Sequence, residues 1–307
     1  MRVLLVSNTT LRCGVAQMGR RMYGALIQTG GVDPGGDHWK GTQVAKWTEK
    51  SYLDNAVVWW PADHPYDIPE VGDEFDVIHL NYHPGTVGHI RPAKPAGAKL
   101  SVYFHEPGTG QEWWDLADLR IVSEPYISDK VVKYLPVPVP DYLPKNFVQF
   151  QGAHVPMEHY RPGDSSVHIG HSSIRRDGID WVAPVIERHP DWRLECSSEW
   201  LSDPEEIERL AACDLTIFHP HSGNLGQSSA VVMGIAARRP LLINSSPMLR
   251  TLHGNPEVYQ YEDPEEGVEV ILRDLREGKA RYPLRLAEER SWKRAAQQLV
   301  SWWEDLL

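Results

Sequence analysis

The chain has 307 residues, of which 41% are hydrophobic and 24% are charged. This composition is ordinary for globular proteins and excludes disordered, collagen-like and disulfide-rich classes, while the length favours two domains over one. The net charge of −11, with acidic residues in both halves, argues against a protein that binds mainly to nucleic-acid phosphates.

The lengths of the apolar runs and the pattern of cysteines indicate the cellular compartment in which the protein is expected. No run approaches the roughly 18–20 residues of a transmembrane helix, and the apolar run near the N-terminus is too short for a signal peptide. The three cysteines, Cys13, Cys196 and Cys213, lack the spacing of a metal site or a disulfide framework. We therefore expect a cytoplasmic protein.

Short apolar runs, which predict β-strands, alternate with helical patterns along most of the chain. Strands are predicted at residues 2–6, 56–59, 77–80, 100–104 and 119–122. After a proline-rich stretch the pattern restarts, with strands predicted at residues 167–170, 192–195, 215–218 and 241–243. Helices are predicted after the first strand and at residues 179–187, 228–237 and 291–307.

This alternation predicts parallel sheets that are covered by helices on both faces, and therefore an α/β fold. We expect two Rossmann-like domains, at residues 1–157 and 158–290, that face a central cleft. The helix at 291–307 either caps the second domain or packs back on the first. Ligands bind such sheets at the carboxyl ends of the strands, so polar residues that follow a strand are candidates for the site.

Two loops between a strand and a helix contain candidate ligand groups. Gly14 lies in the first loop, where a glycine allows a ligand to approach the backbone or simply forms a tight turn. Arg175 and Arg176 lie in the loop after residues 167–170. Arginine pairs are often solvated, but their guanidinium groups also suit a phosphate leaving group.

A third loop opens an apolar helix with two consecutive serines. The serines either cap the helix or, with the amides of its first turn, hold a diphosphate. The residues of this loop are Gly226, Gln227, Ser228 and Ser229.

Histidines follow several predicted strands. His83 follows the strand at 77–80, His105 and Glu106 follow the strand at 100–104, and His219 follows the strand at 215–218. A lone histidine more often has a structural role. Two neighbouring loops that each supply one indicate a site.

In this order and spacing, the segments resemble the GT-B glycosyltransferases, and within them the large retaining group called family 4. Residues 13–16 resemble the family's first glycine loop, and residues 75–83 and 102–106 resemble its next two strand-end motifs. Residues 175–178 resemble its phosphate loop, residues 212–242 the core of its donor domain, and residues 291–292 the start of its last helix.

The resemblance implies an enzyme that moves a sugar from a nucleotide diphospho-sugar of the UDP type to an acceptor hydroxyl, with retention of configuration and without a metal ion or other cofactor. It assigns residues 1–157 to the acceptor and 158–290 to the donor, and lets the helix at 291–307 cross back to the first domain. The sequence contains no Asp-x-Asp motif of the metal-dependent GT-A type. The acceptor is left open among a glycan, a lipid, a small molecule, a protein and modified DNA.

The same resemblance implies a role for each candidate residue. His105 and Glu106 are the implied catalytic residues. The implied donor-binding residues are Gly14, Arg175, Arg176, Gly226, Gln227, Ser228 and Ser229. The implied contacts to the acceptor or the sugar are Gln17, His83 and His219.

One departure from the family keeps two alternatives open. The family usually carries two glutamates eight positions apart, where this chain has Leu225 and Met233, and no Asp or Glu occurs between Leu215 and Pro256. The first alternative is a GT-B module that binds a nucleotide or sugar without catalysis. The second is a transferase that acts on hydroxymethylpyrimidine bases in DNA, as in phages, which the net charge argues against.

Overall fold

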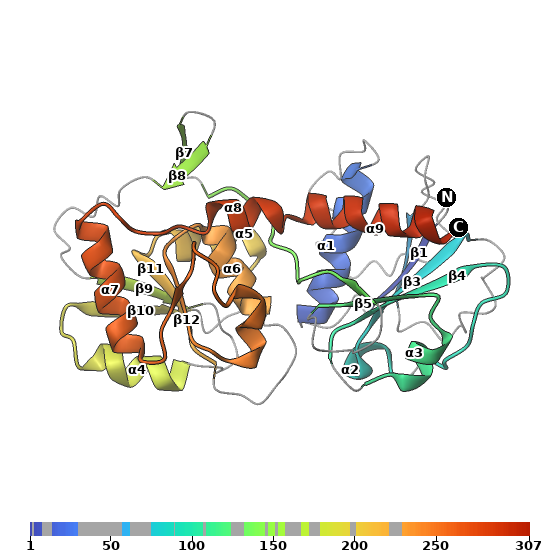
Figure 1. The fold of residues 1–307 in the computed structure, drawn as a ribbon, viewed down its shortest axis with the longest axis horizontal. Helices are drawn as coiled ribbons and strands as arrows, with labels where there is room; N and C mark the ends of the chain where they lie inside the picture. Colours follow the sequence, from blue (N-terminus) through green and yellow to red (C-terminus); the bar gives the residue numbers. More distant parts are fainter. Residues whose placement is uncertain are drawn as a thin grey trace. The chain divides into compact units, whose positions relative to one another are not determined.

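The chain divides into two compact units (Figure 1). The first comprises Met1–Val137 and Trp292–Leu307, and the second comprises Pro138–Ser291. The division falls earlier in the chain than the boundary expected after residue 157, so the proline-rich segment belongs largely to the second unit. This computed structural model describes residues 1, 3–7, 14–29, 57–61, 75–88, 90–106, 109–123, 132–144, 147–150, 153–156, 167–171, 179–196, 201–220 and 229–307.

A six-stranded parallel sheet in the order β2-β1-β3-β4-β5-β6 forms the centre of the first unit. Its strands are β1 (Val3–Ser7), β2 (Val57–Pro61), β3 (Val77–Tyr82), β4 (Lys99–Phe104), β5 (Leu119–Val122) and β6 (Lys133–Tyr134). The helices of this unit are α1 (Gly14–Thr29), α2 (Pro84–Val87), α3 (Gln111–Leu116) and α9 (Trp292–Leu306). Leu80, Val102 and Phe104 are buried on one face of the sheet together with Trp113 of α3.

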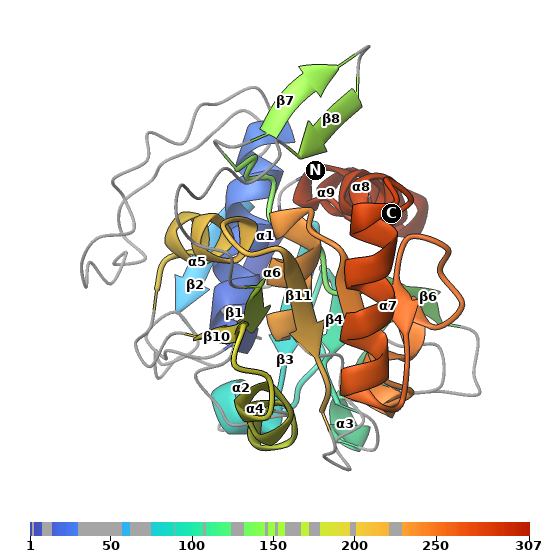
Figure 2. The same cartoon turned by 90° about the vertical axis from the view of Figure 1, so that its left-hand side faces the viewer.

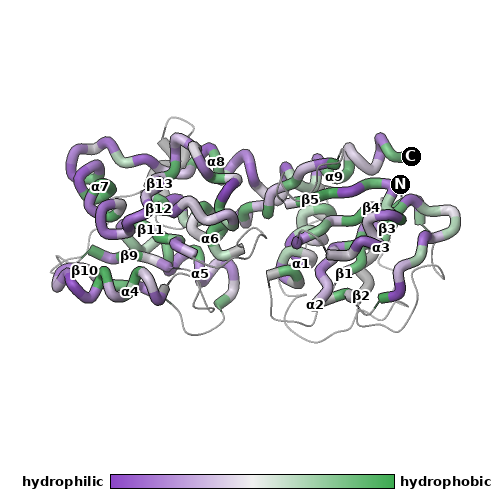
Figure 3. The backbone as a smooth tube through the Cα atoms, turned by 60° about the horizontal axis from the view of Figure 1, so that its bottom comes forward, coloured by the Kyte–Doolittle hydropathy of each residue, from purple (hydrophilic) through white to green (hydrophobic). Residues whose placement is uncertain are grey.

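The last helix of the chain, α9, completes the core of the first unit. Its buried side chains recur at helical spacing, so hydrophilic and hydrophobic colours alternate along it in Figure 3. The Nε1 of Trp303 donates a hydrogen bond of 3.1 Å to the Oγ of Ser101 on β4, and its ring centroid lies 5.2 Å from that of His79 on β3. The helix is therefore fixed to the sheet by a buried polar contact as well as by apolar packing.

The second unit contains a five-stranded parallel sheet in the order β10-β9-β11-β12-β13. Its strands are β9 (Val167–His171), β10 (Trp192–Cys196), β11 (Leu215–Phe218), β12 (Leu241–Ile243) and β13 (Tyr259–Gln260). The helices are α4 (Ile179–Glu187), α5 (Asp203–Ala211), α6 (Ser229–Ala237), the 3-10 helix η3 (Pro247–Leu252), α7 (Pro264–Arg276) and α8 (Leu284–Glu289). A separate antiparallel hairpin consists of β7 (Phe147–Phe150) and β8 (Ala153–Pro156) (Figure 2).

The apolar helix α6 packs directly on β11. Its residues from Val231 to Ala237 are all buried. A Cβ atom at Gly234 would lie 2.4 Å from the ring of Phe218, so the short distance between helix and strand requires glycine there. The two parallel sheets and their covering helices confirm the predicted α/β fold.

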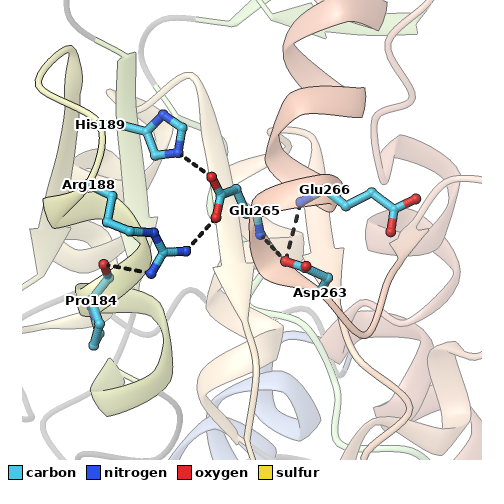
Figure 4. A network of polar contacts seen from close by, with 6 residues as sticks. All are labelled: Pro184, Arg188, His189, Asp263, Glu265 and Glu266. Atoms are coloured by element: carbon cyan, nitrogen blue, oxygen red, sulfur yellow. Dashed lines mark hydrogen bonds and ion pairs between the residues drawn. The ribbon is translucent and has the colours of Figure 1, made fainter.

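A polar network on the second unit joins the end of α4 to the start of α7 (Figure 4). The carboxylate of Glu265 pairs with Arg188 and accepts a hydrogen bond of 2.7 Å from the Nε2 of His189. Asp263 caps α7 by accepting from the backbone N–H of Glu265 at 2.8 Å. These pairs are partly exposed to solvent, so they contribute little to the free energy of unfolding.

The length and hydropathy of the helices show whether any of them could span a membrane. Within the described segments, no helix combines the length and the apolar character that crossing a bilayer requires.

Candidate functional site

The strand order of each unit marks where a ligand is expected. In the first unit β2 and β3 lie on opposite sides of β1, and in the second unit β10 and β11 lie on opposite sides of β9. The connections leave the sheet in opposite directions at these points, and open α/β sheets bind ligands at the carboxyl ends of such strands. The candidate residues near these strand ends are therefore well placed to contact a ligand.

At the switch point of the first unit, Asn81 near the end of β3 connects three elements. Its Nδ2 donates hydrogen bonds of 3.0 Å to the Oγ of Ser7 on β1 and to the carbonyl oxygen of Val15 in the first turn of α1. Its Oδ1 lies 2.6 Å from the Nε2 of His105, which follows β4. The Asn81 side chain thus holds the start of α1, where Gly14 lies, beside His105.

His105 is a partly exposed side chain in a polar but weakly solvated setting. Burial, together with charge repulsion from the neighbouring His83 and His79, lowers its pKa to about 3. Its ring centroid lies 4.8 Å from that of Tyr103. The imidazole is therefore neutral at physiological pH and acts through hydrogen bonds rather than through charge.

His83 and Glu106 form a second pair beside it, one from the end of β3 and one from the end of β4. The Nε2 of His83 lies 3.0 Å from the Oε1 of Glu106, and the Nδ1 of His83 accepts a hydrogen bond of 3.0 Å from the N–H of Gly85. Because Nδ1 accepts, the N–H that faces Glu106 is on Nε2, and it donates a hydrogen bond to the carboxylate. The side chains are 25% and 32% exposed, so a ligand can reach the carboxylate.

We call Asn81, His83, His105 and Glu106 the carboxyl-end cluster. The structure brings together three residues that the sequence predicted, His83, His105 and Glu106, with the start of the helix at Gly14. It also adds Asn81, which the sequence analysis missed. The available signal was the alternation along β3, in which the buried polar His79 and Asn81 alternate with the apolar Ile78 and Leu80.

At the switch point of the second unit, the ring of His171 on β9 stacks on Phe218 of β11, with centroids 5.4 Å apart. Arg209 of α5 holds the ends of β9 and β10 by donating to the carbonyl oxygens of His171 at 2.8 Å and Glu195 at 2.6 Å. It also pairs with the buried Glu206 at 2.7 Å. Arg209 therefore holds the carboxyl ends of β9 and β10 in place.

The ends of β11 and β12 are held in a similar way, by hydrogen bonds from a side chain to the backbone. His219 is buried, and its Nε2 donates to the carbonyl oxygen of Tyr261 at 3.0 Å. Asn244, at the end of β12, donates to the carbonyl oxygen of Pro220 at 3.0 Å. The structure thus gives His219 a supporting contact to the backbone.

The remaining predicted residues divide into two groups. Gly14 and Ser229 are the first residues of α1 and α6, and Gln17 is a partly exposed residue of α1. Met233, at one of the positions where family 4 carries glutamate, is buried in α6. The predicted residues that lie outside the described part of the chain are Arg175, Arg176, Gly226, Gln227 and Ser228.

In the portion of the chain with described coordinates, no three His, Cys, Asp or Glu side chains group in a way that could hold a metal ion.

Known proteins resemble this chain in fold but not in amino-acid sequence. No family model and no curated protein matches the amino-acid sequence. Solved structures match the fold along the whole chain. HepE from Anabaena in complex with UDP has a TM-score of 0.59 at 9% identity and covers 99% of this chain and 100% of its own.

Two further structures give the same result. A glycosyltransferase from Rickettsia africae has a TM-score of 0.61 at 11% identity, with 99% of this chain and 98% of that chain covered. Sucrose-phosphate synthase from Thermosynechococcus elongatus has a TM-score of 0.61 at 13% identity, with 100% and 99% covered. The chain has the GT-B fold. This confirms the expected GT-B resemblance, while the assignment to family 4 stays an expectation.

Proposed function

We propose that this GT-B chain is a glycosyltransferase that moves a sugar from a nucleotide diphospho-sugar of the UDP type to an acceptor hydroxyl. The observation that carries the proposal is the carboxyl-end cluster, a neutral histidine and an accessible carboxylate at a switch point of a GT-B fold. Related GT-B structures support the choice of donor, since HepE was solved with UDP and with UDP and glucose.

The proposed roles follow from the chemistry of each group. The bond between the anomeric carbon and the diphosphate breaks, and the acceptor oxygen bonds to that carbon. Arg175, Arg176 and the amides at the start of α6 stabilise the charge on the departing diphosphate. The Glu106 carboxylate, oriented by His83, accepts the proton of the acceptor hydroxyl.

Fixed guanidinium groups and helix amides can replace a metal ion as counter-charge for the leaving diphosphate. We therefore propose transfer that survives removal of metal ions by EDTA. The resemblance to family 4 further implies retention at the anomeric carbon. The anomeric coupling constant of the product, measured by NMR, tests retention.

The first experiment is thermal unfolding in the presence of UDP, GDP, ADP or TDP at millimolar concentration. A ligand at about 100 times its dissociation constant adds roughly 2.7 kcal/mol to the free energy of unfolding, which gives a clear rise in melting temperature. We expect this rise with UDP and its loss in Arg175→Ala/Arg176→Ala. The control is Arg273→Ala, which removes a 61% exposed guanidinium from α7 and should keep the rise.

A second candidate function is binding of a nucleotide sugar without transfer. The absence of any Asp or Glu between Leu215 and Pro256 favours it, because the family's paired glutamates fall in that segment. Turnover separates the two functions. A protein that binds UDP and releases none from UDP-sugars with any acceptor would be a binding module.

A further inference from the structure

The amide of Asn81 can have only one orientation. The side chain is fully buried, and one end of it faces the carbonyl oxygen of Val15 at 3.0 Å. A carbonyl oxygen only accepts hydrogen bonds, so this end must be the NH2 group. The Oδ1 therefore faces His105.

That orientation determines where His105 carries its proton. The Oδ1 of Asn81 also only accepts, so the Nε2 of His105, 2.6 Å away, must be the donor. A neutral imidazole has a single N–H, and Nδ1 is therefore left with a lone pair. This nitrogen has no hydrogen-bond partner among the residues that the structure describes.

The surroundings keep the ring in this state. Among the described residues, the amide of Asn81 and the ring of Tyr103 contact it, and the imidazoles of His79 and His83 lie near enough to affect its charge. The imidazoles oppose a positive charge on His105, and the nearby carboxylate of Glu106 is engaged by His83. His105 therefore presents a hydrogen-bond acceptor, in contrast to the donor expected of a protonated histidine.

We propose that Asn81 is a positioning residue that fixes His105 as the Nε2–H tautomer, so that the Nδ1 of His105 accepts a hydrogen bond from a sugar hydroxyl group. The sugar part of this inference rests on the proposed function. The tautomer part does not, because it concerns the protein without any ligand. The hydroxyl group can belong to the donor sugar or to a sugar acceptor, which the test distinguishes.

The test is long-range ¹H–¹⁵N NMR of the histidine rings in the full chain, with His105 assigned by the signals lost in His105→Gln. We expect the Nε2–H pattern for His105, unchanged between pH 5 and 8. A proton on Nδ1, or titration within that range, would overturn the positioning role. If His105→Gln does not fold, correlations from the ring to the assigned backbone identify His105 in the wild type, and the same spectrum decides the point.

The variant Asn81→Asp adds a second readout. A carboxylate in that position favours the imidazolium ion, so the pKa of His105 should rise into the range where its signals titrate. The matched control is Asn244→Asp, which introduces the same charge at a buried asparagine that also donates to a carbonyl oxygen. It should leave the signals of His105 unchanged, and a similar effect of both variants would contradict the proposal.

Ligand additions to the wild type test the sugar contact. If the hydroxyl group belongs to the donor sugar, the ¹⁵N chemical shift of the His105 Nδ1 should change more with UDP-glucose than with UDP. If it belongs to a sugar acceptor, that shift should change when glucose is added to the UDP complex. No movement in either case, in a sample whose melting temperature UDP raises, overturns the sugar contact. A sample that UDP does not stabilise argues against the proposed function and leaves the tautomer result to stand.

Discussion

Helix α9 has a buried tryptophan near each end, Trp292 and Trp303, and replacing them tests which contacts hold the helix on the sheet. Trp303 is completely buried and donates to Ser101 at 3.1 Å, whereas Trp292 is 3% exposed and its Nε1 has no hydrogen-bond partner within the described residues. Replacing each by phenylalanine removes a similar apolar volume. The two variants therefore differ mainly in the fate of one N–H group.

The difference can be estimated from these contacts. Trp303→Phe loses a hydrogen bond worth about 1 kcal/mol, whereas Trp292→Phe removes a buried, unpaired donor that costs about 1–3 kcal/mol in the wild type. Trp303→Phe should therefore be less stable than Trp292→Phe by roughly 2–4 kcal/mol. At about 2–4 °C per kcal/mol, the melting temperatures should differ by roughly 4–16 °C.

Thermal unfolding followed by far-UV circular dichroism measures this difference without relying on tryptophan fluorescence. Equal melting temperatures, or a less stable Trp292→Phe, would refute the assignment of the Trp303 hydrogen bond as the polar contact that holds α9.

Three further predictions concern the first unit and its cluster. Gly110 has a φ of 71° and a Cβ there would lie 2.4 Å from the ring of Tyr82, whereas Gly254 has the same φ and open space around it. Gly110→Ala should therefore lower the free energy of unfolding by more than the roughly 1 kcal/mol expected for Gly254→Ala. Urea unfolding of both variants measures this difference. Similar losses of stability in the two variants would contradict the close contact with Tyr82. Burial lowers the pKa of His79 to about 3, whereas a histidine in the unfolded chain has a pKa of about 6.5. The unfolded chain therefore binds the proton first, and the free energy of unfolding falls as the pH drops below about 6.5. Between pH 7 and pH 5 this amounts to about 2 kcal/mol, and the pH dependence of unfolding should be flatter by that amount in His79→Gln; an unchanged slope would count against a neutral buried His79. Glu106→Gln keeps an acceptor for His83 but removes the base, so turnover should fall by about 10²–10⁴-fold while UDP still raises the melting temperature; full activity would exclude Glu106 as the base.

Much of the fold follows from apolar patterns in the sequence. The predicted strands at 119–122, 215–218 and 241–243 match β5, β11 and β12, and the predicted helix at 179–187 matches α4. These segments are buried, so their apolar runs reflect the core directly. The sequence analysis did not locate the amphipathic helices α5 and α7, which carry many charges, nor the hairpin of β7 and β8, which lies outside both sheets.

The candidate site was predictable only in part. His83, His105 and Glu106 follow strands, and parallel strands bring their carboxyl ends to one edge, so their proximity could be expected. The role of Asn81 depends on the contact with Val15 on another element, which a strand pattern does not contain. The supporting contact of His219 likewise depends on the backbone of Tyr261, 42 residues further along the chain.

The central claim is that the chain binds and uses a nucleotide diphospho-sugar. Isothermal titration calorimetry with UDP and UDP-glucose, on the wild type and on Arg175→Ala/Arg176→Ala, tests it most directly. We expect saturable binding of about one nucleotide per chain, and loss of this binding in the double variant. Absence of binding to UDP, GDP, ADP and TDP in the folded wild type would contradict it.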